Sequence, residues 1–224
     1  MPHGRTLLGL LLPVSALHAQ IAVTSDPDLD HVILAVPSLT WGIEEFTRLT
    51  GIEPRRGGRH PGRGTENALV SLGAGHYLEL LAPVTPAAAS APARMAPMGW
   101  ALHTRDLPAL IERVKAKGFQ ILGPVPGSRR TPDNTLLQWR TAATGGKGLE
   151  AAPFFIEWAS GTPHPSTTSP GGCSLAALEL TLPDTTRMHD FLITAGFVPT
   201  LRTGRSAALR ITLECPKGRV TFSP

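Results

Sequence analysis

The chain has 224 residues, which is enough for one large domain or two small ones with a real hydrophobic core. Its hydrophobic fraction of 42% and its charged fraction of 17% are typical of a globular protein and exclude a largely disordered one. The net charge of +4 comes from scattered arginines, and no segment is long and apolar enough to predict a membrane span.

The first twenty residues have the order of a secretory signal. Arg5 precedes an apolar stretch over residues 7–17, and small residues follow before Gln20. The alternative is an N-terminal extension of the domain, or an upstream start codon. We therefore expect a cytoplasmic protein, or a periplasmic or secreted one if residues 1–19 are cleaved. Residues 1–20 are left out of the fold argument.

A strand–helix–strand unit begins at residue 30. The β-branched apolar run 31–36 predicts a buried strand, and Ser38 or Thr40 can cap the helix that follows. Apolar residues then recur at helical spacing until Gly51, which predicts the end of the helix. Residues 67–81 contain two apolar segments around a Gly-Ala-Gly turn and predict a β-hairpin.

The same order recurs twice more along the chain, with helices that end at Gly118 and Gly196. The later predicted strands lie at 100–104, 136–140, 154–158, 175–182, 208–213 and 219–222. Each unit is therefore β-α-β-β-β, shortened in the last, and linkers rich in Pro and Ala at 83–97 and 159–171 separate the units. We predict an α+β protein with a domain of two βαβββ modules over residues 28–160 and an additional partial βαββ module over 172–224, packed on it.

Three polar residues stand at unusual points in these apolar strands. His31 opens the first strand, and Glu79 lies inside Tyr-Leu-Glu-Leu-Leu, where a carboxylate needs a partner. Glu157 takes what looks like the matching place in Phe-Phe-Ile-Glu-Trp. An ion pair with a nearby arginine would explain a single glutamate, but the repetition favours a shared site. A histidine and two carboxylates around one cavity suit a divalent ion such as Zn, Mn, Fe or Ni.

A loop rich in Gly and Arg follows the first helix. Its arginines, which include Arg59 and Arg63, have no aromatic neighbours to stack bases, so they favour anionic small molecules over nucleic acid. His60 has no apolar surroundings and is a candidate ligand, general base or substrate contact. The Asn67 amide can bind a substrate carbonyl, or else cap a turn.

The two cysteines, Cys173 and Cys215, are too few for a disulfide scaffold. Pairing in an oxidising compartment is one alternative, and two buried free thiols are what we expect. The chain also has no Gly-x-Gly-x-x-Gly, Walker or Gly-x-Ser-x-Gly sequence, which argues against nucleotide binding and a serine nucleophile.

The segments 30–37, 58–67 and 77–81 resemble the glyoxalase-like domain proteins of the vicinal oxygen chelate superfamily, also called the glyoxalase/bleomycin resistance/dioxygenase superfamily. The resemblance implies paired βαβββ modules whose strands curl into an open barrel around a metal. Carried over, the ligands fall on His31, Glu79 and Glu157. A second ligand histidine is expected at Gly99 or Trp100, and neither is histidine. Either the metal then has three protein ligands and open positions for water and substrate, or no metal is bound.

Two functions follow as hypotheses. The first is a metal-dependent lyase, isomerase or dioxygenase acting on a small oxygenated substrate. In it His31, Glu79 and Glu157 hold the metal, His60 and Glu157 take catalytic roles, and Arg59, Arg63 and Asn67 contact the substrate. The second is a non-catalytic protein of the same fold that binds or sequesters a small molecule. The remaining alternative is a domain kept for assembly alone, in which apolar strand faces pair between subunits; it predicts a homodimer with a filled cavity.

Overall fold

The computed structural model describes residues 29–73, 75–85 and 92–224, so the predictions for residues 1–20 lie outside the described residues. The helices are α1 Leu39–Thr50, α2 Leu107–Ala116, α3 Pro165–Thr168 and α4 Thr186–Ala195. The strands of the first two units are β1 Leu29–Ala35, β2 Arg55–His60, β3 Thr65–Ser71, β4 Tyr77–Pro83, β5 Ala96–His103, β6 Ile121–Arg130, β7 Leu136–Thr144 and β8 Phe154–Trp158. The strands of the last unit are β9 Ser174–Leu182, β10 Leu201–Thr203, β11 Ala208–Cys215 and β12 Gly218–Phe222.

The helix ends follow the predicted capping residues. Ser38 accepts a hydrogen bond from the Trp41 amide (3.4 Å), and Gly51 adopts a left-handed conformation (φ 82°) directly after α1. At α2, the Asp106 carboxylate accepts from the Ala109 amide at 3.0 Å. These local signals set the helix limits, which agree with the sequence prediction.

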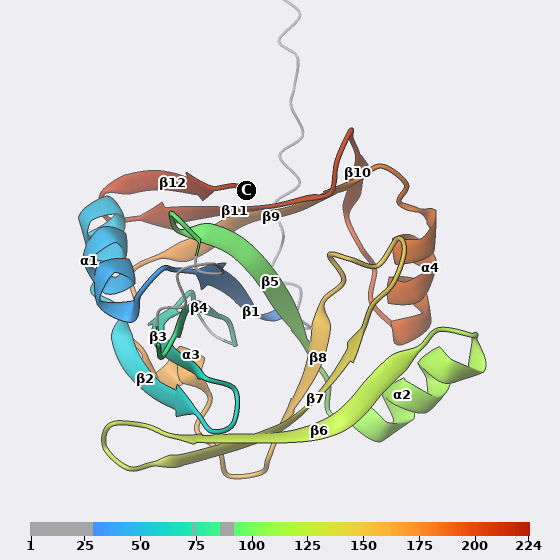
Figure 1. Cartoon of the computed structure of the whole chain (residues 1–224), viewed down its shortest axis with the longest axis horizontal. Coiled ribbons are helices and arrows are strands. Elements are labelled where there is room, and N and C mark those ends of the chain that lie inside the picture. The colour runs from blue at the N-terminus through green and yellow to red at the C-terminus, as the bar shows by residue number, and fades with distance from the viewer. Residues whose placement is uncertain (1–28, 74, 86–91) are drawn as a thin grey trace, which may run out of the picture.

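The first two units form one curled eight-stranded sheet, with the order β2-β3-β4-β1-β5-β8-β7-β6. Within each unit the last strand runs parallel to the first, β4 beside β1 and β8 beside β5. The units join through the antiparallel pair β1 and β5, so their concave faces turn toward a common interior (Figure 1). This arrangement confirms the predicted α+β fold of repeated βαβββ modules in an open barrel.

The last unit forms its own four-stranded sheet, β10-β9-β11-β12, across the outer side of the larger sheet (Figure 1). Its strand pairing differs from that of the first two units, because β9 lies between β10 and β11. Side chains such as Ile211 and Phe222 join Val32 and Phe46 in one buried cluster. Residues of β9 and α4 join α2 and β8 in a second cluster. The apolar core therefore lies behind the sheet and leaves the concave side for a cavity.

Two strands, β2 and β6, do not have the sequence pattern that predicts a strand. β2 has the sequence Arg-Arg-Gly-Gly-Arg-His, and β6 carries Pro124 and Pro126. Both lie at the edges of the eight-stranded sheet, where apolar alternation is not required and proline is tolerated. Their strand character comes from pairing with β3 and β7 and not from their own composition.

These two edge strands approach one another across the opening of the curled sheet. The buried Arg129 of β6 donates a hydrogen bond to the Gly57 carbonyl of β2. Gly58 has φ 128°, and a Cβ atom there would lie 2.3 Å from the Arg130 carbonyl oxygen. Glycine at this position is therefore required for both the backbone conformation and the close approach of the two strands.

Replacing Gly58 with alanine is expected to destabilise the fold by about 2 kcal/mol, because positive φ strain adds to a clash with the opposite backbone. Urea unfolding measures the change. Gly73 is the matched control, since it has φ 110° but no atom within 4 Å of an added Cβ. A Gly58→Ala variant no less stable than Gly73→Ala would contradict the proposed packing role.

The two cysteines correct the sequence expectation. Cys173 and Cys215 form a disulfide between the start of β9 and the end of β11, and no free cysteine remains in the described chain. The prediction of two free thiols is therefore wrong. Periodicity places both residues in apolar surroundings but carries no information on their separation, which depends on the pairing of β9 with β11.

Among the described residues, no helix combines the length and the apolar character that a membrane crossing needs.

Candidate functional site

A cavity of about 280 Å³ opens on the concave side of the eight-stranded sheet. Five of the residues predicted for the site line it: His31, His60, Arg63, Asn67 and Glu79. The other lining residues are Ile33, Thr65, Tyr77, Leu81, Arg129, Trp139, Thr141, Phe154, Ile156 and Trp158. The curl of one sheet thus brings together side chains from both modules, which are up to 127 positions apart in sequence (31 to 158).

His31 is held by its neighbour in sequence. Its Nδ1 lies 2.6 Å from the Asp30 carboxylate, and both side chains are buried. A carboxylate at this distance fixes the proton on Nδ1, so Nε2 faces the cavity. The His31 ring stacks on Tyr77, its partner on β4, with ring centres 4.5 Å apart. Packing and hydrogen bonding therefore hold His31 in one orientation.

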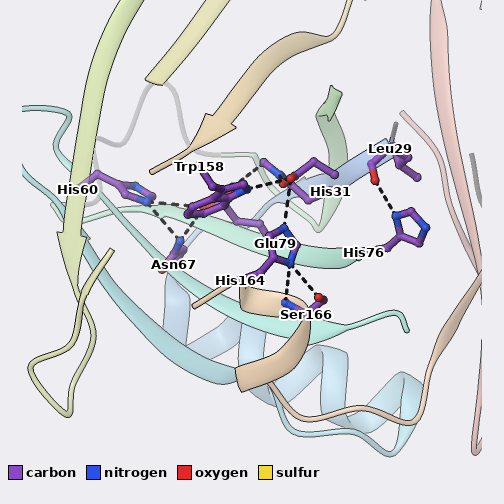
Figure 2. A network of polar contacts seen from close by, with 10 residues as sticks. Leu29, His31, His60, Asn67, His76, Glu79, Trp158, His164 and Ser166 are labelled. Atoms are coloured by element: carbon purple, nitrogen blue, oxygen red, sulfur yellow. Dashed lines mark hydrogen bonds and ion pairs between the residues drawn. The ribbon is translucent and has the colours of Figure 1, made fainter. Parts of the chain in front are cut away.

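Asp30 is itself held by Trp158 of β8 and by His164 at the start of α3, which the sequence analysis did not place in the site. Its Oδ2 accepts from Trp158 Nε1 at 2.9 Å and lies 3.2 Å from His164 Nε2. Figure 2 shows this network, with His164 in turn contacting Ser166. Burial by itself would raise the Asp30 pKa, but the hydrogen bonds from His164 and His31 outweigh it and hold that pKa well below its usual range.

The low pKa of Asp30 predicts acid sensitivity. Its ionised form is stabilised in the folded state, so its contribution is present above about pH 4, the pKa of an unfolded aspartate, and is lost as the pH falls toward the lower folded value. Asp30→Asn is expected to cost about 2 kcal/mol at pH 7 and to flatten this part of the profile, because hydrogen bonds to a charge are lost. Urea unfolding from pH 2 to 7 measures both effects. The exposed Asp190→Asn is the control, and an unchanged acid limb in Asp30→Asn would contradict the assignment.

Glu79 of β4 is positioned by a second set of polar contacts, from the neighbouring strands β3 and β2. Asn67 Nδ2 donates to Glu79 Oε1 at 2.7 Å and lies 3.2 Å from His60 Nε2 (Figure 2). His60 Nδ1 lies 2.9 Å from the Thr65 hydroxyl. Burial lowers the pKa of His60, which favours its neutral form. His60 and Asn67 therefore hold Glu79 in place. The Nδ2 group of Asn67 is engaged by Glu79 and His60.

The two sets of polar contacts meet at the Glu79 carboxylate. His31 Nε2 lies 3.7 Å from Glu79 Oε2, and the His60 Nε2 lies 3.8 Å from Glu79 Oε1. Glu79 is buried, as are His31 and Asn67. A ring nitrogen and a carboxylate thus face the same small volume, and both side chains are buried.

Aromatic side chains form the rest of the wall and were not predicted for the site. Trp139 and Trp158 pack with ring centres 5.5 Å apart, and Phe154 contacts the edge of His31. Tyr77 is buried, and burial raises its pKa well above the usual value, so its hydroxyl stays protonated. The signal was present in β4 and β8, because Tyr77 and Glu79, like Phe154, Ile156 and Trp158, recur at the two-residue period of a strand face.

Glu157 does not join this site. It points to the other side of β8, where Arg140 donates to it at 2.7 Å and the Leu107 amide at the start of α2 donates at 3.0 Å. This placement contradicts both roles predicted for Glu157, as metal ligand and as catalytic residue. The physical reason is strand alternation: Ile156 faces the cavity, so the next residue must face away from it.

Of the two predicted arginines, one lines the cavity and the other does not. Arg63 lines the cavity from the loop between β2 and β3. Arg59 does not line it, because its side chain is 72% exposed and lies 3.9 Å from Glu66. A third arginine, Arg129 of β6, is buried against the cavity and was not predicted, since β6 itself was not predicted as a strand.

The side chains around the cavity offer few free donors for the expected divalent ion. Zinc bound by protein has ligands at about 2.1 Å, and three protein ligands are usual in catalytic sites. His31 and Glu79 provide two facing donors, but Asn67 occupies His60 Nε2 and one Glu79 oxygen, and Glu157 lies elsewhere. In the described part of the chain no three His, Cys, Asp or Glu side chains are arranged to hold a metal ion. These residues do not fit the predicted three-ligand metal site.

The chain is similar to known proteins both in sequence and in structure. A family described as a glyoxalase-like domain matches residues 29–195. A hypothetical protein from Staphylococcus aureus has a similar structure, with a TM-score of 0.57, 16% identity, and coverage of 87% of this chain and 84% of that one.

Two methylmalonyl-CoA epimerases are also similar in part. A variant of the Streptomyces coelicolor enzyme has a TM-score of 0.46, 19% identity, and coverage of 61% of this chain and 97% of that one. The Mycobacterium tuberculosis enzyme has a TM-score of 0.41 and 20% identity, and the match covers 63% of this chain and 94% of that one. These two resemblances are too weak for an argument about this chain. No curated protein matches it.

Proposed function

Because this chain belongs to the glyoxalase-like domain family of the vicinal oxygen chelate superfamily, we propose that its cavity binds a small oxygenated molecule and moves a proton on it. The proposed class is an isomerase or lyase. The observation that carries the proposal is the orientation of His31, whose Nδ1 is fixed by buried Asp30 while its Nε2 faces Glu79 at 3.7 Å inside the cavity.

The chemistry begins with a carbon-bound proton next to a carbonyl group. His31 Nε2 takes this proton, and the electron pair of the C–H bond moves into the carbonyl, which becomes an enolate. The negative Asp30 stabilises the imidazolium that forms. The proton then returns to the same carbon, which gives exchange or inversion at that carbon, or it goes to the enolate oxygen, which gives the enol. It comes from His31 directly or after transfer to Glu79, which lies 3.7 Å from His31 Nε2.

Tyr77 is suited to the developing oxyanion. Tyr77 lines the cavity, and its hydroxyl remains protonated because burial raises its pKa. A hydrogen-bond donor held in a site of low dielectric stabilises negative charge on oxygen more strongly than water does. The substrate carbonyl would therefore lie near Tyr77, with its acidic carbon near His31.

Proton exchange in D₂O tests the proposal without knowledge of the product. The purified chain is incubated with 2-oxobutanoate, phenylpyruvate and dihydroxyacetone, and NMR follows loss of the proton beside the carbonyl. We expect exchange above the buffer rate with at least one compound, retained after dialysis against a chelator. Exchange that occurs only with stoichiometric bound metal in elemental analysis would instead support the metal-dependent version, and no exchange with any of them would count against the proposal.

A second candidate is a binding protein without chemistry. The aromatic wall of Trp139, Trp158 and Phe154 favours it, because such surfaces hold flat ligands by stacking alone. Saturable quenching of tryptophan fluorescence by a compound that shows no proton exchange would favour this candidate.

A further inference from the structure

One buried cation in the cavity has no carboxylate partner. Arg129, next to the end of β6, is 3% exposed and lines the cavity. Its hydrogen bond to the Gly57 carbonyl fixes one end of the guanidinium. Among the described residues, no Asp or Glu oxygen lies within 4 Å of it, whereas Arg140 and Arg48 each pair with a glutamate.

This placement is unfavourable unless something compensates the charge. Transfer of an unpaired cation from water into a protein interior is unfavourable, because the cation loses its hydration. The cost shows in Arg129, where burial lowers the pKa of the guanidinium. Glu79 attracts it only at a distance, and that carboxylate already accepts a hydrogen bond from Asn67.

The surroundings define which group would compensate it. Burial lowers the pKa of His60 and favours its neutral form. Arg129 is therefore the buried cation among the described residues that line the cavity, and exposed Arg63 adds a second positive charge. A guanidinium is flat and offers paired N–H donors that match the two oxygens of a carboxylate. Trp139 and Trp158 face the same cavity and provide a stacking surface for a flat apolar body.

We propose that Arg129 is the anchor for the carboxylate of the substrate, and that the site takes small aromatic or otherwise flat carboxylic acids. This inference rests on the proposed function in that it uses the same cavity. A volume of about 280 Å³ lies just below the usual range for small-molecule sites, about 300–1,000 Å³, so the ligand is small. With its carboxylate on Arg129, the carbon chain of such an acid extends toward His31 and Glu79.

Equilibrium binding tests the anchor. Phenylacetate, its neutral amide phenylacetamide and the cation phenethylamine share one shape, and titration calorimetry or the fluorescence of the cavity tryptophans measures their affinities. We expect phenylacetate to bind at least about tenfold more tightly than the other two, which is about 1.4 kcal/mol. Equal affinities, tighter binding of the amine, or no binding of any of them would overturn the inference.

Variants then assign the preference to one residue. Arg129→Met should abolish the preference for phenylacetate, while Arg130→Met, whose guanidinium binds the Asn134 carbonyl outside the cavity, should keep it. Circular dichroism checks that Arg129→Met folds, because Arg129 also links the edge strands β6 and β2 through the Gly57 carbonyl. If it does not fold, the preference of the wild-type chain decides, with inorganic phosphate as competitor. Stronger binding of phosphate than of phenylacetate would overturn the carboxylate assignment.

The two proposals fail in different ways. Preferential binding of phenylacetate through Arg129 without proton exchange on any 2-oxo compound would retain the anchor and remove the enzyme proposal. Proton exchange on dihydroxyacetone as fast as on the two 2-oxo acids would retain the enzyme proposal and remove the carboxylate anchor.

Discussion

His31→Gln is expected to reduce the proton-exchange rate by about 10²- to 10⁴-fold, the usual contribution of a positioned general base. Glutamine is close in size and can keep a hydrogen bond to Asp30, but it has no basic nitrogen to face Glu79 across the 3.7 Å gap. NMR exchange in D₂O with the compound that the wild-type chain accepts measures the loss. Binding of that compound should change far less than the rate.

His189→Gln is the matched control for this substitution. His189 lies on α4 with its side chain 57% exposed, so the same change there should leave both folding and exchange unaltered. Full exchange activity in His31→Gln would contradict the role given to His31. A loss of exchange accompanied by loss of the folded far-ultraviolet signal would be a structural effect, and His31→Asn then provides the second test.

Opening the Cys173–Cys215 disulfide is expected to lower the free energy of unfolding by about 4 kcal/mol, because the bond closes a long loop in the unfolded chain. The two cysteines are 42 positions apart in sequence. For a chain of this size the loss corresponds to a fall in melting temperature on the order of 10 °C. Thermal unfolding of Cys173→Ala/Cys215→Ala measures it.

Reduction provides an independent check on the same quantity. The wild-type chain in excess reductant should melt close to the double variant, since the loop is open in both. Each single alanine variant should lose about as much as the double variant, because either one removes the bond. A wild-type melting temperature that reductant leaves unchanged would show that the disulfide does not stabilise the chain.

The parts of the fold that local patterns predict are those where one residue and its near neighbours decide the outcome. Ser38 and Gly51 sit at the helix ends as expected, because a cap needs only a side chain or a left-handed residue within one turn. The strand with His31 and the strand with Glu79 were likewise readable from apolar runs.

Edge strands and the second module were less readable. β2 and β6 lack apolar alternation, and they are strands because β3 and β7 offer hydrogen-bonding partners. Arg129 was missed with β6. The sequence analysis places Glu157 on the wrong face of its strand. The sequences of β4 and β8 are similar, but glutamate is the third residue of β4 and the fourth of β8. A shift of one residue along a strand turns the side chain to the opposite face.

From the sequence alone came the α+β class, the repeated βαβββ units, and His31 and Glu79 as the polar residues of buried strands, because these depend on spacing within a few turns or one strand. The tertiary structure alone decided the rest of the site. The curl of the sheet brings His164 and Trp158 to Asp30, turns Glu157 out of the cavity and buries Arg129 within it. Those outcomes depend on contacts between strands far apart in sequence, and strand spacing carries no information about which distant strand becomes the neighbour.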